Sequence, residues 1–141
     1  DNRNKGCEYP NGRRVFTTSD FGETWTEHPS SHRALVEPTC MASLHRHVYT
    51  ADGCSRNILL FSNPDNWKSR DRITLKASLD GGMTWPDEYH ILIDEYRSAG
   101  YSCITSVDED AVGILYESSQ ADLAFVRIGL DEILKTNNTF K

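Results

Sequence analysis

Short runs of β-branched, aromatic and other apolar residues recur along the whole chain. Turn-forming pairs such as Asp52-Gly53, Asn63-Pro64 and Ala99-Gly100 separate them. This pattern predicts strands at residues 14–17, 41–49, 57–62, 73–77, 90–93, 103–107, 111–116 and 123–128. A helical pattern is found only from Leu130 to Lys135, so we expect an all-β chain with a short C-terminal helix.

A repeated turn motif follows two of the predicted strands. Residues 18–25 and 78–85 both read Ser/Thr-x-Asp-x-Gly-x-Thr-Trp, and the second copy begins 60 residues after the first. The carboxylate can accept bonds from backbone N–H groups and the glycine adopts a conformation that other residues resist, so the motif predicts a tight hairpin. We interpret its fixed positions as structural: Asp20, Gly22 and Trp25 in the first copy, and Asp80, Gly82 and Trp85 in the second.

The spacing of the two copies indicates a structural repeat of about four short strands, which is typical of one blade of a β-propeller. The 141 residues hold about two and a half such units. We therefore expect residues 1–141 to form one portion of a propeller rather than a closed ring. The opening residues Asp1 to Lys5 carry no targeting signal, and we expect the chain to begin in mid-protein.

Charge and composition exclude two functional classes. Fifteen basic residues are scattered among 21 acidic ones, for a net charge of -6, so the sequence predicts no nucleic-acid partner. With 38% hydrophobic residues the chain is ordinary for a globular protein, and no apolar run approaches the roughly 20 residues of a membrane span.

Neither a metal nor a cofactor is predicted. The four cysteines include no C-x-x-C pair, and we expect them to be small buried side chains, with disulfides left open. His45 and His47 alternate on one predicted strand, so their rings share a face, but no third ligand is evident. Each turn motif has too few carboxylates for a calcium loop.

Several further segments, taken with the two turn motifs, carry a family resemblance. Their order and spacing resemble the C-terminal region of bacterial sialidases of glycoside hydrolase family 33, in which such turns, called Asp-boxes, lie on the outer hairpins of a six-bladed propeller. The resemblance covers essentially the whole chain and implies the C-terminal part of a catalytic propeller. The segments are Phe61-Ser62-Asn63-Pro64, Ser69-Arg70, Gly100-Tyr101-Ser102-Cys103-Ile104-Thr105 and Gly113-Ile114-Leu115-Tyr116-Glu117.

The resemblance assigns roles to three side chains. Tyr101 matches the catalytic nucleophile, and Arg70 matches the third member of an arginine triad that binds the sialic acid carboxylate. Glu117 matches the carboxylate that orients the first triad arginine. Arg72 is the alternative to Arg70, and Arg3 is similar to a residue that follows the second triad arginine.

The proposed chemistry fits these residue types. A guanidinium binds the sialic acid carboxylate through paired charge-assisted bonds. A carboxylate nucleophile would be repelled by that substrate, whereas neutral Tyr is not, and reaction through Tyr gives net retention of configuration. Because the pKa of free Tyr is near 10, a neighbouring base must activate it.

In the family, the base Glu, the general acid/base Asp and the first triad Arg lie upstream of the matched region. The resemblance therefore implies that this chain alone is inactive and needs the remaining N-terminal propeller blades. It also implies a sialylated glycan substrate and a secreted, periplasmic or cell-surface location. Two alternatives stay open: a non-catalytic carbohydrate-binding propeller and a trans-sialidase.

Overall fold

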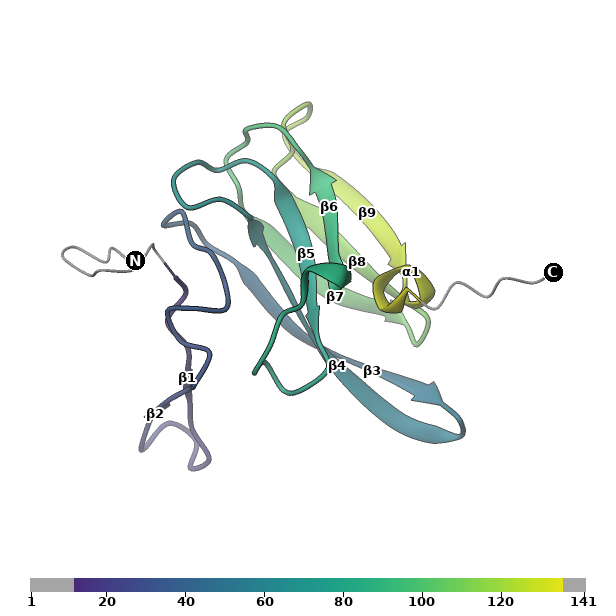
Figure 1. Cartoon of the computed structure of the whole chain (residues 1–141). Helices are drawn as coiled ribbons and strands as arrows, with labels where there is room; N and C mark the ends of the chain where they lie inside the picture. The colour runs from purple at the N-terminus through teal and green to yellow at the C-terminus, as the bar shows by residue number, and fades with distance from the viewer. Residues whose placement is uncertain (1–11, 136–141) are drawn as a thin grey trace.

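Consecutive strands of this chain pair with one another to form three antiparallel sheets (Figure 1). The computed structural model describes residues 12–135. The first sheet contains β1 (Phe16–Thr17) and β2 (Thr26–Glu27); the second contains β3 (Ser43–Ala51), β4 (Cys54–Pro64), β5 (Ile73–Ser78) and β6 (His90–Asp94); the third contains β7 (Ser102–Asp108), β8 (Ala111–Tyr116) and β9 (Ala124–Gly129). A 3-10 helix, η1 (Asp87–Tyr89), and α1 (Leu130–Leu134) complete the elements. The prediction of an all-β chain with a short C-terminal helix is confirmed.

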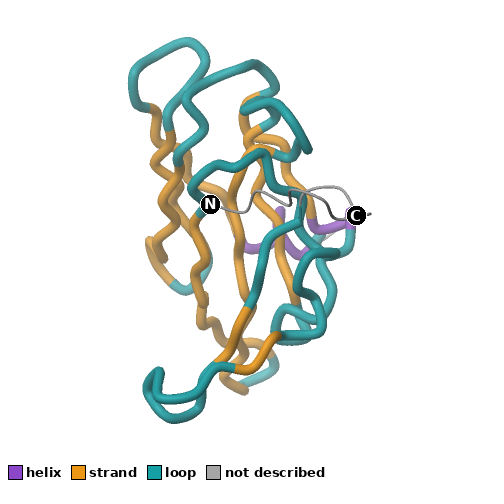
Figure 2. Tube along the Cα trace, turned by 90° about the vertical axis from the view of Figure 1, so that its left-hand side faces the viewer, coloured by secondary structure: helices purple, strands orange, loops and turns teal. Residues whose placement is uncertain are grey.

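The antiparallel order of β4, β5 and β6 determines at which end of the second sheet each loop lies. Because β4 and β6 run in the same direction, the β4–β5 and β6–β7 loops leave the second sheet at the same end. Figure 2 shows the strands running lengthwise, with loops at both ends of the strands and further loop segments beside them. Loops from different sheets therefore meet at one end.

Strand β4 is longer than the apolar pattern predicts. Asp52 and Gly53 both have positive φ, at 53° and 70°, and form a two-residue turn that pairs Ala51 with Cys54. Such turns match the twist of the two strands that they join, so the ladder continues to the turn although its last side chains are polar. The predicted strand at 57–62 thus extends to Cys54–Pro64.

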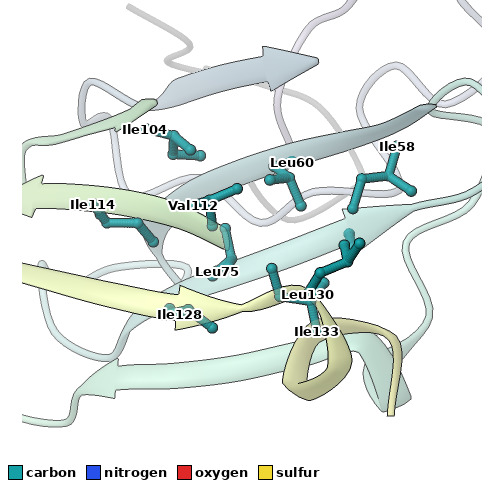
Figure 3. Packing of buried hydrophobic residues seen from close by; sticks show 10 residues of the cluster. Ile58, Leu60, Leu75, Ile104, Val112, Ile114, Ile128, Leu130 and Ile133 are labelled. Carbon is teal, nitrogen blue, oxygen red and sulfur yellow. The ribbon is translucent and has the colours of Figure 1, made fainter. Parts of the chain in front are cut away.

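The main core lies between the second and third sheets (Figure 3). Alternate side chains of each strand point to it, as the two-residue period of a strand requires. Helix α1 adds Leu130 and Ile133, which are three residues apart and so share one face. The buried strand residues of this core are Ile58, Leu60, Leu75, Ala77, Ile104, Val112, Ile114 and Ile128.

Each Asp-box holds its hairpin turn with its own side chains. In the second copy the Asp80 carboxylate accepts bonds from the Thr84 N–H at 2.9 Å, the Thr84 hydroxyl at 2.6 Å and the Ser78 hydroxyl at 2.7 Å. Gly82 has φ +90° and donates its N–H to the Ser78 hydroxyl. The first copy repeats these contacts with Thr18, Asp20, Gly22 and Thr24.

The two box tryptophans differ in burial. Trp85 is 9% exposed and packs edge-on against Phe61, with ring centroids 5.9 Å apart, in a second core cluster that includes Leu35. Trp25 is 60% exposed, and its indole N–H bonds to the Gly22 carbonyl at 3.0 Å. One sequence motif therefore supplies a core residue in one copy and a surface residue in the other.

The expectation that the cysteines are buried is correct for Cys40 and wrong for Cys54 and Cys103, which are exposed. Cys103 lies between the buried Ser102 and Ile104 on β7, so the strand period turns it outward. All three thiols are free, and Cys7 lies outside the described residues. Within residues 12–135 no helix has the length and apolarity needed to cross a membrane.

The burial difference predicts unequal effects of two matched substitutions. Trp85→Ala should lower the free energy of unfolding by about 3–5 kcal/mol, because it removes a buried aromatic side chain and leaves a cavity. Trp25→Ala should cost less than about 1 kcal/mol, because that ring is already in water. Chemical denaturation of the two variants measures both values, and equal costs would contradict the packing described.

The Asp80 carboxylate predicts a loss of stability in acid. The Thr84 hydroxyl, the Thr84 backbone N–H and the Ser78 hydroxyl lower the pKa of Asp80 from 3.8 to about 2. The stabilising bonds are thus fully present above pH 4 and are lost as the pH falls through about 2. We expect Asp80→Asn to flatten the fall in stability between pH 4 and pH 2, as measured by denaturation at stepped pH. An unchanged slope would be inconsistent with this role.

Candidate functional site

Tyr101 and Glu117 face each other at the end of the β7–β8 ladder. The last regular pair of this ladder is Ser102 with Tyr116, so Tyr101 and Glu117 form the next step outward. The Tyr101 N–H donates to Glu117 Oε2 at 2.9 Å, and the Glu117 N–H donates to the Tyr101 carbonyl at 2.9 Å. These two bonds fix the backbone at Tyr101 and the carboxylate of Glu117 together.

Arg70 reaches the same place from the β4–β5 loop. Its Nη1 donates to the Ala99 carbonyl at 3.0 Å, and its Nη2 donates to the Thr39 carbonyl at 3.1 Å. Its Cζ lies 5.6 Å from the centroid of the Tyr101 ring, which is cation–π range. The three side chains to which the sequence assigned roles therefore form one cluster, although 47 residues separate the first from the last.

A glycine makes this close approach possible. Gly100 has φ +93°, and an added Cβ would lie 3.0 Å from Cys40 Sγ, 3.0 Å from Pro64 Cγ and 3.2 Å from Arg70 Cβ. No larger residue fits there without displacing its neighbours. The Gly-Tyr pair thus brings the Tyr101 backbone against the loop that carries Arg70.

The cluster is open to solvent on one side. The Tyr101 side chain is 42% exposed, while Arg70 and Glu117 are half-buried. Two of the five guanidinium N–H groups of Arg70 are bonded to carbonyls, so others remain for an anionic ligand. The arrangement therefore presents an anion-binding group beside an accessible phenol.

Arg72, the alternative to Arg70, is placed differently. It is exposed, has φ +58° and uses its backbone to bond the Glu95 carbonyl at 3.3 Å. Both arginines precede β5 and belong to the β4–β5 loop, so they do not share the face of a strand. The contacts with the Tyr101 ring favour Arg70, and Arg3 lies outside the described residues.

The predicted pair of histidines does share a face. His45 and His47 each bond to the Ser106 hydroxyl at 2.9 Å, and the second nitrogen of His47 contacts the Glu109 carbonyl at 3.0 Å. Burial, followed by the neighbouring His47, lowers the pKa of His45. Residues 12–135 contain no group of three side chains arranged to hold a metal ion.

Sequence reasoning missed an ion pair between the half-buried Arg13 and the buried Glu37. Glu37 is 1% exposed and pairs with the Arg13 guanidinium. Its Oε1 also accepts the Cys40 N–H at 2.7 Å, and Arg13 Nη2 donates to the Cys40 carbonyl at 2.8 Å. Burial raises the pKa of the Cys40 thiol, which contacts the Gly100 carbonyl at 3.3 Å. The one available signal was a lone acid in the stretch Leu35-Val36-Glu37-Pro38.

Comparison with known proteins places this chain among sialidases. No protein-family model matches the chain. A curated sialidase from Bacteroides fragilis is 46% identical over 123 residues, which are 87% of this chain and 23% of that protein. A sialidase from Micromonospora viridifaciens is 33% identical over 107 residues, 74% of this chain and 16% of that protein. The chain thus spans about a quarter or less of the length of these relatives.

The solved structures that this chain resembles are also sialidases or trans-sialidases. A Hadza microbial sialidase is 52% identical, with a TM-score of 0.77 over 86% of this chain and 24% of that one. The leech intramolecular trans-sialidase has a TM-score of 0.66 at 22% identity over 87% of this chain and 21% of that one. The Ruminococcus gnavus intramolecular trans-sialidase has a TM-score of 0.64 at 22% identity over 86% of this chain and 29% of that one. The last two show likeness of fold alone.

The fold belongs to the class of sialidase-type, Asp-box β structures. More particularly, the chain is a bacterial sialidase homologue and corresponds to a segment of such an enzyme.

The crowding at Gly100 predicts a large effect of one added methyl group. Gly100→Ala should cost several kcal/mol, because it adds overpacking of about 1–3 kcal/mol to the strain of positive φ. The matched control is Gly53→Ala, where φ is +70° and no atom lies within 4 Å of the new Cβ. That control should cost about 1–2 kcal/mol. Chemical denaturation compares the two, and an equal loss would argue against steric control at Gly100.

Proposed function

We propose that the protein containing this chain is an exo-α-sialidase, which hydrolyses terminal α-linked sialic acids from sialylated glycans. One observation carries the proposal: in a sialidase homologue, the guanidinium of Arg70 lies 5.6 Å from the ring of an accessible Tyr101. An anion bound to Arg70 lies next to the phenol. A sugar with a carboxylate on its anomeric carbon would therefore bring that carbon to the phenol oxygen.

In this mechanism Arg70 binds the substrate and Tyr101 reacts with it. A base takes the phenol proton as the phenol oxygen attacks the anomeric carbon, the bond to the leaving-group oxygen breaks, and a general acid gives that oxygen a proton. Water then attacks the same carbon and gives a proton to the conjugate base of that acid, Tyr101 leaves and recovers its proton from the base, and two inversions give net retention. The phenol is neutral before attack, so it is not repelled by the substrate carboxylate.

Activation of Tyr101 needs groups beyond those described. A neutral phenol is a weak nucleophile, so a base must take its proton as it attacks. Within residues 12–135 no side chain is hydrogen-bonded to the Tyr101 hydroxyl. We therefore assign the base, the general acid and the first two triad arginines to the remainder of the protein, and we expect the 141-residue chain alone to be inactive.

Glu117 has the position of an orienting carboxylate. One of its oxygens accepts the Tyr101 N–H, which leaves the other for a cation. No basic side chain of residues 12–135 forms an ion pair with it. A triad arginine from another blade would complete this pair and would lie beside the substrate carboxylate bound by Arg70.

Exposed apolar side chains support the presence of further blades. On the outer face of the third sheet Val107 is 47% exposed, Leu115 45% and Phe125 60%. The sheets of two, four and three strands fit the end of one blade, a whole blade and most of another, which is a little over two four-stranded blades in residues 12–135. A neighbouring blade of a six-bladed propeller would cover this face, and a fourth strand from elsewhere in the protein would pair with β9 and complete the third sheet. Sialylated glycans outside the cytoplasm are the expected substrates.

The test is hydrolysis of a fluorogenic α-sialoside by the complete protein and by the 141-residue chain. The complete protein should be active and the chain inactive. Tyr101→Phe should lower kcat by about a thousandfold or more, because it removes the nucleophile. The Glu117 contacts use the Tyr101 backbone, so the substitution leaves them intact and circular dichroism should be unchanged.

A Tyr101→Phe enzyme with a near wild-type rate would refute the nucleophile assignment. A folded complete protein that binds sialic acid without cleaving it would instead support a non-catalytic carbohydrate-binding propeller. Transfer of sialic acid to an added sugar acceptor, followed by mass spectrometry, would indicate a trans-sialidase.

A further inference from the structure

The ion pair between half-buried Arg13 and buried Glu37 clamps one residue of the loop before β3, Cys40. Glu37 accepts the Cys40 N–H at 2.7 Å, while Arg13 donates to the Cys40 carbonyl at 2.8 Å. The two charges also bond to each other, and the Glu37 side chain is 1% exposed. A buried charge that lost its partner would be strongly destabilising, so the pair acts as one unit. Both backbone polar groups of Cys40 are therefore fixed by this unit.

The residue next to the clamp is held in an unfavourable conformation. Thr39 has φ +57°, in the left-handed region that β-branched residues rarely adopt. Such a conformation persists only where the surroundings enforce it. The clamp on Cys40 is adjacent to Thr39, and the bonds through Glu37 fix the chain on its other side.

This strained residue anchors the arginine of the site. The Thr39 carbonyl accepts Arg70 Nη2 at 3.1 Å, and the second anchor, the Ala99 carbonyl, accepts Nη1 at 3.0 Å. The Cys40 thiol contacts the Gly100 carbonyl, one residue after that second anchor. The two carbonyls that accept bonds from the Arg70 guanidinium thus belong to, or lie next to a residue in contact with, the segment Thr39-Cys40.

We propose that Glu37 and Arg13 are positioning residues for substrate binding: by holding Thr39 in its left-handed conformation they aim the Arg70 guanidinium at the carboxylate of the bound sugar. This inference rests on the proposed function for the identity of the ligand. Neither residue touches the substrate. Their effect passes through the Thr39 carbonyl.

Glu37→Gln tests the proposal in the complete protein. Glutamine keeps an oxygen for the Cys40 N–H but removes the charge that holds Arg13. KM for the α-sialoside should rise about ten- to hundredfold, as expected for misplacement of a binding group, with kcat little changed. Asp80→Asn, which weakens a turn far from the site, is the control for general loss of stability and should leave KM unchanged.

Two double variants separate positioning from a merely structural role. In an Arg70→Ala background, Glu37→Gln should raise KM no further, because its effect passes through Arg70. Adding Thr39→Gly to Glu37→Gln should lower KM again, because glycine adopts positive φ without the clamp. Additive effects with Arg70→Ala, or no recovery with Thr39→Gly, would overturn the proposal.

A milder variant covers the case in which Glu37→Gln does not fold. Arg13→Lys keeps the charge but replaces the planar guanidinium fork with a compact ammonium, so it cannot bond Glu37 and Cys40 in the same geometry. KM should again rise, by a smaller factor, and an unchanged KM would overturn the proposal.

Binding of free sialic acid, measured by calorimetry, makes the test independent of catalysis. If the wild type binds without hydrolysis, the proposed function fails, and the Kd values of the same variants decide the positioning role. Absence of binding by a folded wild-type protein would reject both.

Discussion

The site depends on the pairing of β7 with β8. This ladder ends at Ser102 and Tyr116, and the bonds between Tyr101 and Glu117 carry it one step further with a side chain in place of a carbonyl. The same pairing supplies Ile104 and Ile114 to the core between the sheets. A shift of one residue would turn these side chains to the opposite face, so the packing of the core fixes the register and, through it, the place of the phenol.

The elements that follow from local chemistry were predictable from the sequence. Alternating apolar runs predicted eight of the nine strands of residues 12–135, all except the two-residue β2. The repeated motif predicted two turns, which show the contacts expected of Asp20 and Asp80. The extension of β4 to Cys54 was not predictable, because it depends on the cross-strand ladder rather than on apolar side chains. Cys103 was misjudged because composition gives the average burial of a residue type and not the face of a strand.

The residues of the candidate site were harder to predict from the sequence than the strands and turns. Tyr101, Arg70 and Glu117 were found through resemblance to a family, since their spacing carries no period of its own. Arg13 and Glu37 were missed because their partnership joins positions 24 residues apart, and neither has a local pattern that requires a partner. Long-range polar contacts are decided by the fold as a whole, so residues that support a site are harder to find than residues that form it.

The turns at one end of the strands stabilise the sheets, and the loops at the other end carry the candidate site. The Asp-boxes at residues 18–25 and 78–85 share an Asp, a Gly, a Thr and a Trp at fixed positions and hold their turns with their own side chains, so each turn is stabilised locally. The loops at the other end repeat nothing: Arg70, Gly100 and Glu117 come from three different connections and hold one another. Because those contacts join one sheet to the next, the geometry of the site depends on how the sheets pack. The loops of the site contact one another, while the Asp-box turns at the opposite end of the strands stabilise the sheets. Arg70 and Tyr101 can therefore be brought together without any change in those turns.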